Sequence, residues 1–364
     1  MITALVFVAI LFSAVLVHEA AHYLNARSVG LPVRAFSVGF GPVLWRRQWR
    51  GTEWRFSAIP LGGYVDLPGM TPEQDADGTL RHASSGFARL GLAAKAWVLI
   101  GGVIANFVLG TLLLASAVTL APGYRALTTG QDPMVHGTVV VEVVPGSPAE
   151  AAGLRANDRI TSLAGIDDPV PADAVEAIQT TRGTLDLTVR GDDGAERSLS
   201  LPWPPDGTED GETPLLGVQL TPADVEAVGF PTAVAESAAF AVRAVPEMVS
   251  GFVRGFGSVL SGRGSDEVAG PVGMVGMVSQ ASQVGVAPVL LLAAIINFSL
   301  AVFNLLPIPG LDGGRLLLAT VVAVRGRPFE PGREEVLHFV GVMAVLALIV
   351  LITLQELQGT FSAG

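Results

Sequence analysis

The sequence predicts an α-helical polytopic membrane protein with four transmembrane helices, a membrane-associated β-hairpin region and an inserted α+β domain outside the membrane. Of its 364 residues, 50% are hydrophobic and only 15% are charged. The mean hydropathy of +0.53 is too high for a soluble domain of this length. Four long apolar runs, with one long acidic segment between the second and the third, complete the pattern.

Four stretches are long enough to cross a bilayer as helices, which takes about 20 apolar residues. They are residues 1–25, 95–121, 287–314 and 336–356. The first differs from a secretory signal peptide because it has no basic start and no small-residue cleavage site, and its apolar run continues into His18. We therefore expect it to remain as the first transmembrane helix.

The basic residues predict the orientation of the chain. The region after the first span carries a cluster of Arg with one Lys, whereas residues 121–286 contain 9 Arg against 22 Asp plus Glu. By the positive-inside rule, residues 26–94 are cytoplasmic and the acidic segment is outside. The net charge of −11 belongs largely to that external segment. We therefore expect the lipid bilayer as a partner and no nucleic acid.

Residues 26–94 are predicted to form membrane-associated β-hairpins on the cytoplasmic side. Apolar and polar side chains alternate there between Gly and Pro breaks, and Trp45, Trp49 and Trp54 are interleaved with arginines, which suits a membrane interface. A small peripheral sheet without a role in substrate binding would explain the same pattern. Residues 315–335, between the last two spans, are expected to form a cytoplasmic loop.

Two segments connect the second span to the third. Residues 122–222 contain short strand-like runs and one helical pattern near residues 172–180, which predicts a compact extracytoplasmic domain. Residues 223–286 carry apolar residues at helical spacing, with charged residues elsewhere. This pattern predicts an amphipathic helical linker lying on the membrane. Pro246 is expected to divide the linker into a pair of helices.

A motif suited to metal chemistry lies near the end of the first span. His18 and His22 are four residues apart in a helical run, so both imidazoles lie on one face and can bind one ion. Glu19, beside them, has the place of a base that takes a proton from the attacking water. The chain has no cysteine, so a metal must be bound by imidazole and carboxylate groups. Ionisable groups inside a span are costly, which favours function over a polar helix end.

A third ligand must come from elsewhere, because catalytic zinc sites usually have three protein ligands and a water. No glutamate follows His22 at the spacing of the thermolysin type. Asp312, at the end of the third span, is the best candidate and is predicted to lie toward the cytoplasmic side, like His18. Three isolated histidines are expected to be surface or interfacial residues: His82, His136 and His338.

Two motifs together resemble those of the site-2 protease family of intramembrane zinc metalloproteases. His-Glu-x-x-His in the first span is followed by Asn-x-x-Pro-x-Pro-x-Leu-Asp-Gly in a later one. The likeness extends to residues 39–42, 60–64 and 102–106 and to the order of the domains. It is close to the bacterial branch that has one PDZ domain and cleaves anti-sigma factors.

This resemblance implies roles for the residues of the site. It makes His18, His22 and Asp312 the ligands of a zinc ion (Zn²⁺) and Glu19 the catalytic acid and base. It also implies that Asn304 holds the substrate or the tetrahedral intermediate. For Asn304 the alternative is a buried amide that braces a helix broken by proline.

The hairpin segment with Gly62, Gly63 and Tyr64 is expected, from the same resemblance, to present a strand edge to the substrate. A helix hides its scissile carbonyls in hydrogen bonds, so it must unwind before attack, and a strand edge can replace those bonds. Residues 137–160 resemble the core of a PDZ domain. Such a domain either captures peptide ends by strand addition or excludes substrates with bulky external domains, and we favour the size filter.

The resulting functional prediction is a zinc metalloendopeptidase of the bacterial inner membrane, with its active site toward the cytoplasm and its PDZ domain outside. It performs the second, or site-2, cleavage of a single-span membrane protein, such as an anti-sigma factor, after a first protease has cut it. The alternative from another class is a catalytically inactive scaffold that binds partners through its PDZ domain. The intact set of His18, Glu19, His22 and Asp312 argues against a scaffold.

Overall fold

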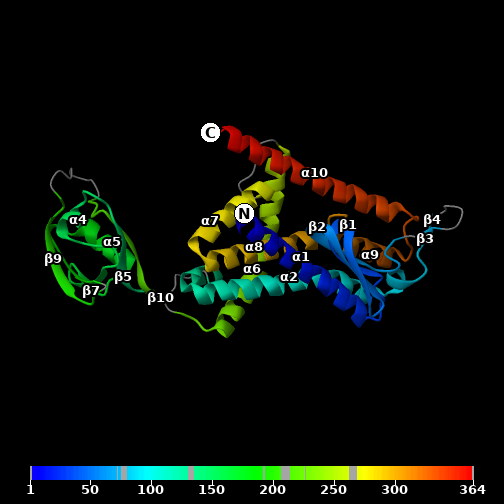
Figure 1. The fold of residues 1–364 in the computed structure, drawn as a ribbon, viewed down its shortest axis with the longest axis horizontal. Coiled ribbons are helices and arrows are strands. Elements are labelled where there is room, and N and C mark those ends of the chain that lie inside the picture. Colours follow the sequence, from blue (N-terminus) through cyan, green and yellow to red (C-terminus); the bar gives the residue numbers. More distant parts are fainter. Residues whose placement is uncertain are drawn as a thin grey trace. The chain divides into compact units, whose positions relative to one another are not determined.

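The computed structural model describes residues 2–71, 73–74, 80–129, 135–191, 193–205, 214–225, 227–261 and 269–362. The chain forms two compact units, one made of residues 1–120 with 230–364 and the other of residues 121–229. The first contains long helices and a long β-hairpin, and the second is built around a sheet (Figure 1). The inserted segment between the second and third spans is therefore a folded unit of its own.

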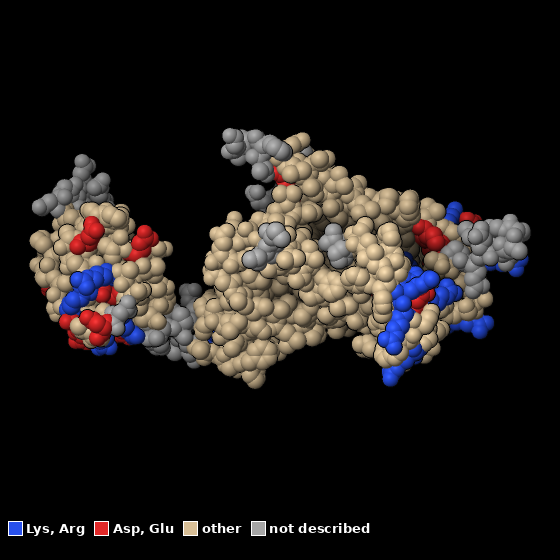
Figure 2. Space-filling model, in the orientation of Figure 1, with Lys and Arg blue, Asp and Glu red and all other residues tan. Residues whose placement is uncertain are grey.

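Four helices of the first unit are long and apolar enough to cross a membrane. They are α1 (Ile2–Ser28), α2 (Leu92–Leu120), α8 (Val286–Leu305) and α10 (Arg333–Ser362). Each satisfies its own backbone hydrogen bonds, as a span must in lipid. On the face shown in Figure 2, the middle of this unit carries almost no charged side chains. The four predicted spans are confirmed as apolar helices.

Helix α2 lies at the centre of this unit. It contacts α1, α8, α6 (Phe230–Leu260) and α9 (Asp312–Arg325). In the most apolar stretch of α2, 56% of the residues are buried within the structure. The corresponding share is 17% in α1, 33% in α8 and 11% in α10. Glycine permits close approach to α8, because a Cβ on Gly110 would lie 2.7 Å from the Phe298 ring. The span with the largest buried share is therefore the one that packs against α1, α6, α8 and α9.

The third span ends earlier than the sequence indicated. Helix α8 ends at Leu305, and Asp312 begins a separate helix instead of lying at the end of the span. Pro307 and Pro309 in the connection cannot donate backbone hydrogen bonds, which stops the helix. Much of the expected loop at residues 315–335 is therefore helical, as the greater part of α9.

A long hairpin follows α1, formed by β1 (Ala35–Trp49) and β2 (Thr52–Asp66). Arg50 and Gly51 make the turn between them, and both have positive φ, as a two-residue type I′ turn requires. From this turn, residues 43–49 pair with residues 52–57 in antiparallel register. The alternating sequence thus produces one long hairpin in this region.

The hairpin then folds back on itself, because its pairing is interrupted between residues 38 and 43. Residues 35–38 pair with residues 63–66 on one side and lie beside residues 53–56 on the other. Within the described part of the chain, no further strand pairs with residues 63–66, which form an edge. Strand β2 also contacts α1. The hairpin is therefore held against the helix that carries His18.

Two helices connect the second unit to α8, namely α6 and α7 (Pro271–Val284). Helix α6 continues through Pro246, where a break was expected. Helix α6 contacts α2 and α8, and this packing offsets the hydrogen bond that the proline removes. The remaining short elements of the first unit are β3 (Glu73–Gln74), β4 (Leu80–Arg81) and a 3₁₀ turn at Gly86–Arg89.

The second unit contains a six-stranded antiparallel sheet in the order β10-β5-β6-β8-β9, with β7 paired to β6. Helices α4 (Pro148–Ala152) and α5 (Pro171–Thr180) accompany it, and Ala174, Ala177 and Ile178 of α5 are buried in its core. The strands are β5 (Val135–Val143), β6 (Arg159–Leu163), β7 (Ile166–Asp167), β8 (Gly183–Arg190), β9 (Glu196–Trp203) and β10 (Val218–Val225). A 3₁₀ turn (Pro122–Tyr124) and α3 (Arg125–Thr129) precede them.

Candidate metal centre

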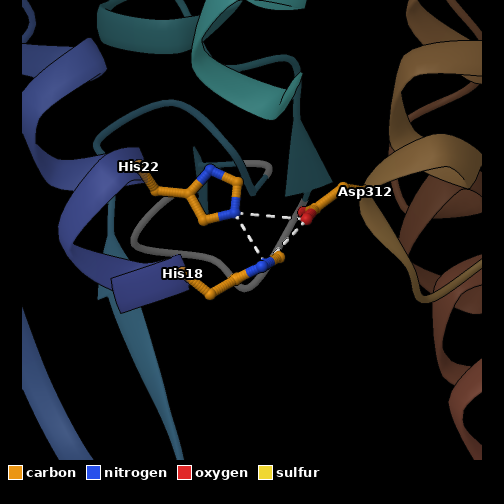
Figure 3. Close-up of side chains that lie close together, drawn as sticks. All are labelled: His18, His22 and Asp312. Carbon is orange, nitrogen blue, oxygen red and sulfur yellow. Dashed lines mark hydrogen bonds and ion pairs between the residues drawn. The ribbon is translucent and has the colours of Figure 1, made fainter. Parts of the chain in front are cut away.

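Three side chains from two helices converge on one point. His18 and His22 occupy successive turns of α1, Asp312 begins α9, and the three point toward one another (Figure 3). His18 Nε2 lies 3.0 Å from Asp312 Oδ2 and 3.1 Å from His22 Nε2. His22 Nε2 lies 3.1 Å from the same carboxylate oxygen. The fold thus brings together the three residues that the sequence nominated as ligands.

The hydrogen bonding of His22 makes its Nε2 an acceptor. Its Nδ1–H donates to the backbone carbonyl of Val98 on α2, at 2.8 Å. In a neutral imidazole the other nitrogen then carries a lone pair. That lone pair faces an oxygen of Asp312, which is also an acceptor, so a proton or a cation must lie between the two atoms. This convergence of acceptors in a buried place favours a metal ion.

The donor set fits zinc. Two imidazole nitrogens and one carboxylate oxygen are the ligands of many catalytic zinc sites, which leave a fourth position open. The ligand atoms of His18, His22 and Asp312 all lie within 4.8 Å of one another. Tetrahedral zinc with bonds of about 2.0–2.1 Å holds its ligand atoms about 3.3 Å apart. The observed separations of 3.0–3.1 Å require only a small outward movement.

Asp312 is placed as an ionised ligand. Its Oδ2 lies 3.0 Å from His18 Nε2 and 3.1 Å from His22 Nε2, so a cation bound between these atoms would keep the carboxyl ionised. Asp312 also lies in the first turn of α9, where the helix dipole favours a negative charge. A carboxylate that stays ionised can bind a cation without first losing a proton.

Tight packing sets the position of Asp312. A Cβ on Gly313 would lie 2.2 Å from the carbonyl oxygen of Leu305, and one on Gly314 would lie 2.0 Å from that of Ile308. Only glycine therefore lets the start of α9 fold back onto the end of α8. This close packing explains why two glycines follow Asp312 in the Leu-Asp-Gly-Gly run.

His338 supports the same loop from α10, although it was expected to be only a surface or interfacial residue. Its Nδ1 accepts a hydrogen bond from the Gly310 backbone N–H at 2.9 Å. A Cβ on Gly341 would lie 1.7 Å from the Pro309 carbonyl oxygen, so α10 packs directly against this loop. No local pattern around His338 indicated a contact with a residue 28 positions away.

Glu19 lies beside the cluster and beside the strand edge. Its carboxylate interacts electrostatically with His22, His18 and Asp312. A Cβ on Gly63 would lie 3.1 Å from Glu19 Cγ and 2.8 Å from the Ser37 carbonyl oxygen. The bare backbone at Gly63 thus permits β2 to approach α1 next to Glu19.

The other nominated residues have structural contacts of their own. Asn304 Nδ2 donates to the Leu300 carbonyl at 3.0 Å, which suits an amide bracing the end of α8. The Tyr64 hydroxyl accepts a hydrogen bond from Arg55 at 2.8 Å. Gly62 has φ of +124°, which side chains rarely adopt. A role of Asn304, Gly62 and Tyr64 in binding substrate stays a prediction.

Comparison with known families supplies the deciding observation. Residues 6–348 match the model of peptidase family M50. This chain belongs to peptidase family M50. Among its relatives, one from Agrobacterium fabrum with a zinc metalloprotease name is 32% identical, over 97% of this chain and 94% of its own. Another relative with a zinc metalloprotease name, from Rhizobium meliloti, is 34% identical over 98% of this chain and 96% of its own. Zinc metalloprotease RasP of Shouchella clausii is 25% identical over 99% of this chain and 100% of its own.

As an M50 peptidase the protein is a zinc metalloprotease, which confirms the predicted enzyme class, the cofactor and the likeness to site-2 proteases. Its four apolar helices make it a multi-pass membrane protein. The family and the spans together support proteolysis within the membrane.

Proposed function

We propose that this M50 peptidase cleaves a single-span membrane protein within the bilayer, as the second step after another protease has cut that protein. In this proposal His18, His22 and Asp312 hold the zinc ion and Glu19 is the acid and base. One observation carries it. Three potential ligand atoms lie 3.0–3.1 Å apart beside the carboxylate of Glu19. Two of them are on α1, a helix able to span the membrane, and the third is on α9.

Zinc, when bound, supplies a Lewis acid that polarises the scissile carbonyl and activates water. Glu19 carries out the proton transfers: it takes a proton from the attacking water and gives it to the leaving amine nitrogen. The Val98 carbonyl holds the His22 ring so that its lone pair stays directed at the site. The burial of both histidines strengthens these interactions because little water screens them.

The strand edge at residues 63–66 is proposed to receive the substrate. Its backbone lies next to Glu19 at Gly63. A substrate helix that unwinds in the membrane leaves backbone groups unsatisfied, which costs several kcal/mol for each group. Pairing with a strand edge satisfies those groups and holds the peptide extended. The scissile bond is thereby presented near the base and the ligands.

The arginine-rich hairpin is proposed to face the cytoplasm of a bacterial cell. Figure 2 shows basic side chains gathered over the hairpin end of the first unit, and Arg46, Arg47 and Arg50 there are exposed. Cleavage at this side releases a cytoplasmic fragment, for which an anti-sigma factor in the inner membrane is the proposed substrate. Reporters fused within residues 73–81 and 167–193 test the orientation. The first is expected inside and the second outside.

The proposal is tested with the full-length protein in detergent, by measuring bound zinc and cleavage of candidate single-span proteins. Glu19→Gln should keep its zinc and lose about 10²–10⁴-fold in rate, as for loss of a general base. Asp312→Ala should lose both zinc and activity, because a ligand is gone. Glu247→Gln is the control, since that carboxylate is 78% exposed. Full zinc occupancy in Asp312→Ala would contradict the ligand assignment.

A further inference from the structure

Asn106 of α2 is a fully buried amide in contact with one of the candidate ligands. Its Nδ2 lies 3.3 Å from His18 Nδ1, and its residue is 0% exposed. Over the described ranges, the amide oxygen Oδ1 has no hydrogen-bond partner. Burying an amide inside a span is costly, and among the described residues the one side chain within hydrogen-bond distance of the Asn106 amide is a candidate ligand.

One face of α2 serves both histidines. Val98, Gly102 and Asn106 follow one another at intervals of four residues, so they lie on the same side of the helix. The Val98 carbonyl accepts from His22 Nδ1–H. A Cβ on Gly102 would lie 2.5 Å from His18 Cε1 and Nε2, so the His18 ring rests on bare backbone. Asn106 lies at Nδ1 of His18, the ring nitrogen that faces away from His22 and Asp312.

The tautomer of His18 depends on which end of this amide faces the ring. If the amide NH₂ faces Nδ1, then Nδ1 accepts and the ring proton is on Nε2, where it points at His22 and Asp312 and blocks a metal. If the amide oxygen faces Nδ1, then Nδ1–H donates and the Nε2 lone pair is free. The oxygen and nitrogen of an amide exchange places by one rotation of the planar group, so the hydrogen-bond network decides between them.

We propose that the Asn106 oxygen accepts the hydrogen bond from His18 Nδ1–H and so sets the metal-binding tautomer, as the Val98 carbonyl does for His22. This inference rests on the zinc site proposed above. Zinc binding through His18 Nε2 requires a proton on Nδ1, and an NH₂ group facing that proton would leave two donors opposed. Asn106 is therefore a positioning residue for the metal centre. It acts through His18.

The test compares two substitutions with opposite expected results. Asn106→Leu keeps a side chain of similar size but makes it apolar and removes the acceptor, so its zinc dissociation constant should rise about 10–100-fold. Asn106→Asp keeps an acceptor at this place but has no donor, so it should bind zinc within about threefold of the natural protein, in the manner of a carboxylate–histidine–zinc arrangement. Both constants are measured by competition with a chromophoric chelator, on full-length protein in detergent.

The matched control is Asn297→Leu. Asn297 is likewise 0% exposed, its oxygen lacks a partner among the described residues, and its Nδ2 donates to Ala293 of its own helix. Zinc affinity should be unchanged in this variant. If Asn106→Leu does not fold, Asn106→Asp decides alone, because an amide that donated to Nδ1 would hold the ring proton on Nε2, and the carboxylate variant would then bind zinc far more than threefold tighter than the natural protein.

A spectroscopic measurement reads the tautomer directly. In metal-free protein with ¹⁵N-labelled histidine, His18 should carry its proton on Nδ1, and Asn106→Leu should shift the population toward Nε2–H. Equal zinc affinity in Asn106→Leu, or a zinc affinity of Asn106→Asp outside that threefold range, would overturn the inference. His18→Ala separates the two levels. If His18→Ala keeps its zinc, the proposed site itself is wrong. If His18→Ala loses its zinc while the Asn106 variants bind zinc normally, only the role of Asn106 is refuted.

Discussion

At the residue scale, contacts behind the candidate ligands fix the orientation of the side chains in the candidate metal centre. His22 is fixed by the Val98 carbonyl, and the loop before Asp312 is fixed by His338. The ring of His18 lies against Gly102 of α2. Such outer contacts keep ligand atoms near a productive geometry, and their loss typically costs 10–100-fold in metal affinity or activity.

Gly102→Ala should weaken zinc binding by about tenfold or more. The added Cβ would lie 2.5 Å from His18 Nε2, so the ring must move away from the other ligands. The zinc dissociation constant of the detergent-purified protein measures this effect.

Gly257→Ala on α6 is the matched control, because its Cβ meets no atom of the described structure within 4 Å. We expect natural zinc affinity there, together with a small gain in stability of about 0.5–1 kcal/mol from helix propensity. Unchanged zinc affinity in Gly102→Ala would show that the His18 ring has room to adjust.

At the scale of elements, short irregular connections place the functional groups. The proline-containing connection between α8 and α9 puts Asp312 at a helix start. The interrupted pairing of β1 and β2 creates an edge at residues 63–66. Both features depend on glycine at points of close backbone approach, Gly313 and Gly63 among them.

Gly63→Ala should slow cleavage while zinc remains bound. Its Cβ would lie 2.8 Å from the Ser37 carbonyl oxygen and 3.1 Å from Glu19 Cγ, so the edge and the base must separate. Initial cleavage rates and zinc content, measured on the same preparation, distinguish this effect from loss of metal. Gly91→Ala is the control, since its Cβ would meet no described atom within 4 Å. A natural cleavage rate in Gly63→Ala would argue against the edge as the substrate site.

The start of α7 is capped by a carboxylate from α10. Glu356 Oε1 accepts hydrogen bonds from the backbone N–H groups of Gly270 at 2.7 Å and Gly273 at 3.2 Å, and Oε2 accepts from Val272 at 3.2 Å. Negative charge at a helix start is stabilising. This contact joins the last span to the helix that precedes α8.

Glu356→Ala should lower the free energy of unfolding by about 1–2 kcal/mol, the size of a lost cap. Glu356→Gln should lower it less, because one oxygen still accepts. Denaturant unfolding in mixed micelles measures both. The control is Glu330→Ala, whose carboxylate is 75% exposed and whose pairing with Arg333 contributes little. Equal losses in Glu356→Ala and Glu330→Ala would exclude a capping role.

At the scale of the whole molecule, the protein divides its tasks between two units. The first unit holds the apolar helices, the candidate metal centre and the strand edge. The second is a strand-rich unit inserted between α2 and α6, which we propose to be a PDZ domain outside the membrane. A filter and a peptide receptor predict opposite results when this unit is removed.

Replacement of residues 121–229 by a flexible linker distinguishes these two roles. A steric filter predicts that the shortened protein gains cleavage of full-length substrates that still carry their external domains. A receptor predicts slower cleavage of the trimmed substrate, because strand-addition contacts are lost. Both substrates are compared at equal bound zinc, which shows that the first unit is intact. Slower cleavage of the trimmed substrate, with no gain for the full-length one, would refute the filter.

The sequence by itself determined the periodic and chemical features of this protein. Apolar runs of about 20 residues predict spans because lipid leaves a helix no other way to satisfy its backbone. A spacing of four residues puts His18 and His22 on one helical face, and a chain without cysteine restricts metal ligands to other groups. The alternation in β1 and β2 likewise predicted hairpin strands.

Only the tertiary structure decided how distant segments meet. The end of α8 at Leu305 and the passage of α6 through Pro246 depend on packing between helices, which local propensity does not contain. The contact of His338 with Gly310 joins α10 to the loop before α9, across 28 positions, and that of Asn106 with His18 joins α2 to α1, across 88 positions. No local spacing encodes such pairs. They arise because α2 and α10 pack against the elements that carry the candidate ligands, and packing selects which buried polar groups come within hydrogen-bond distance.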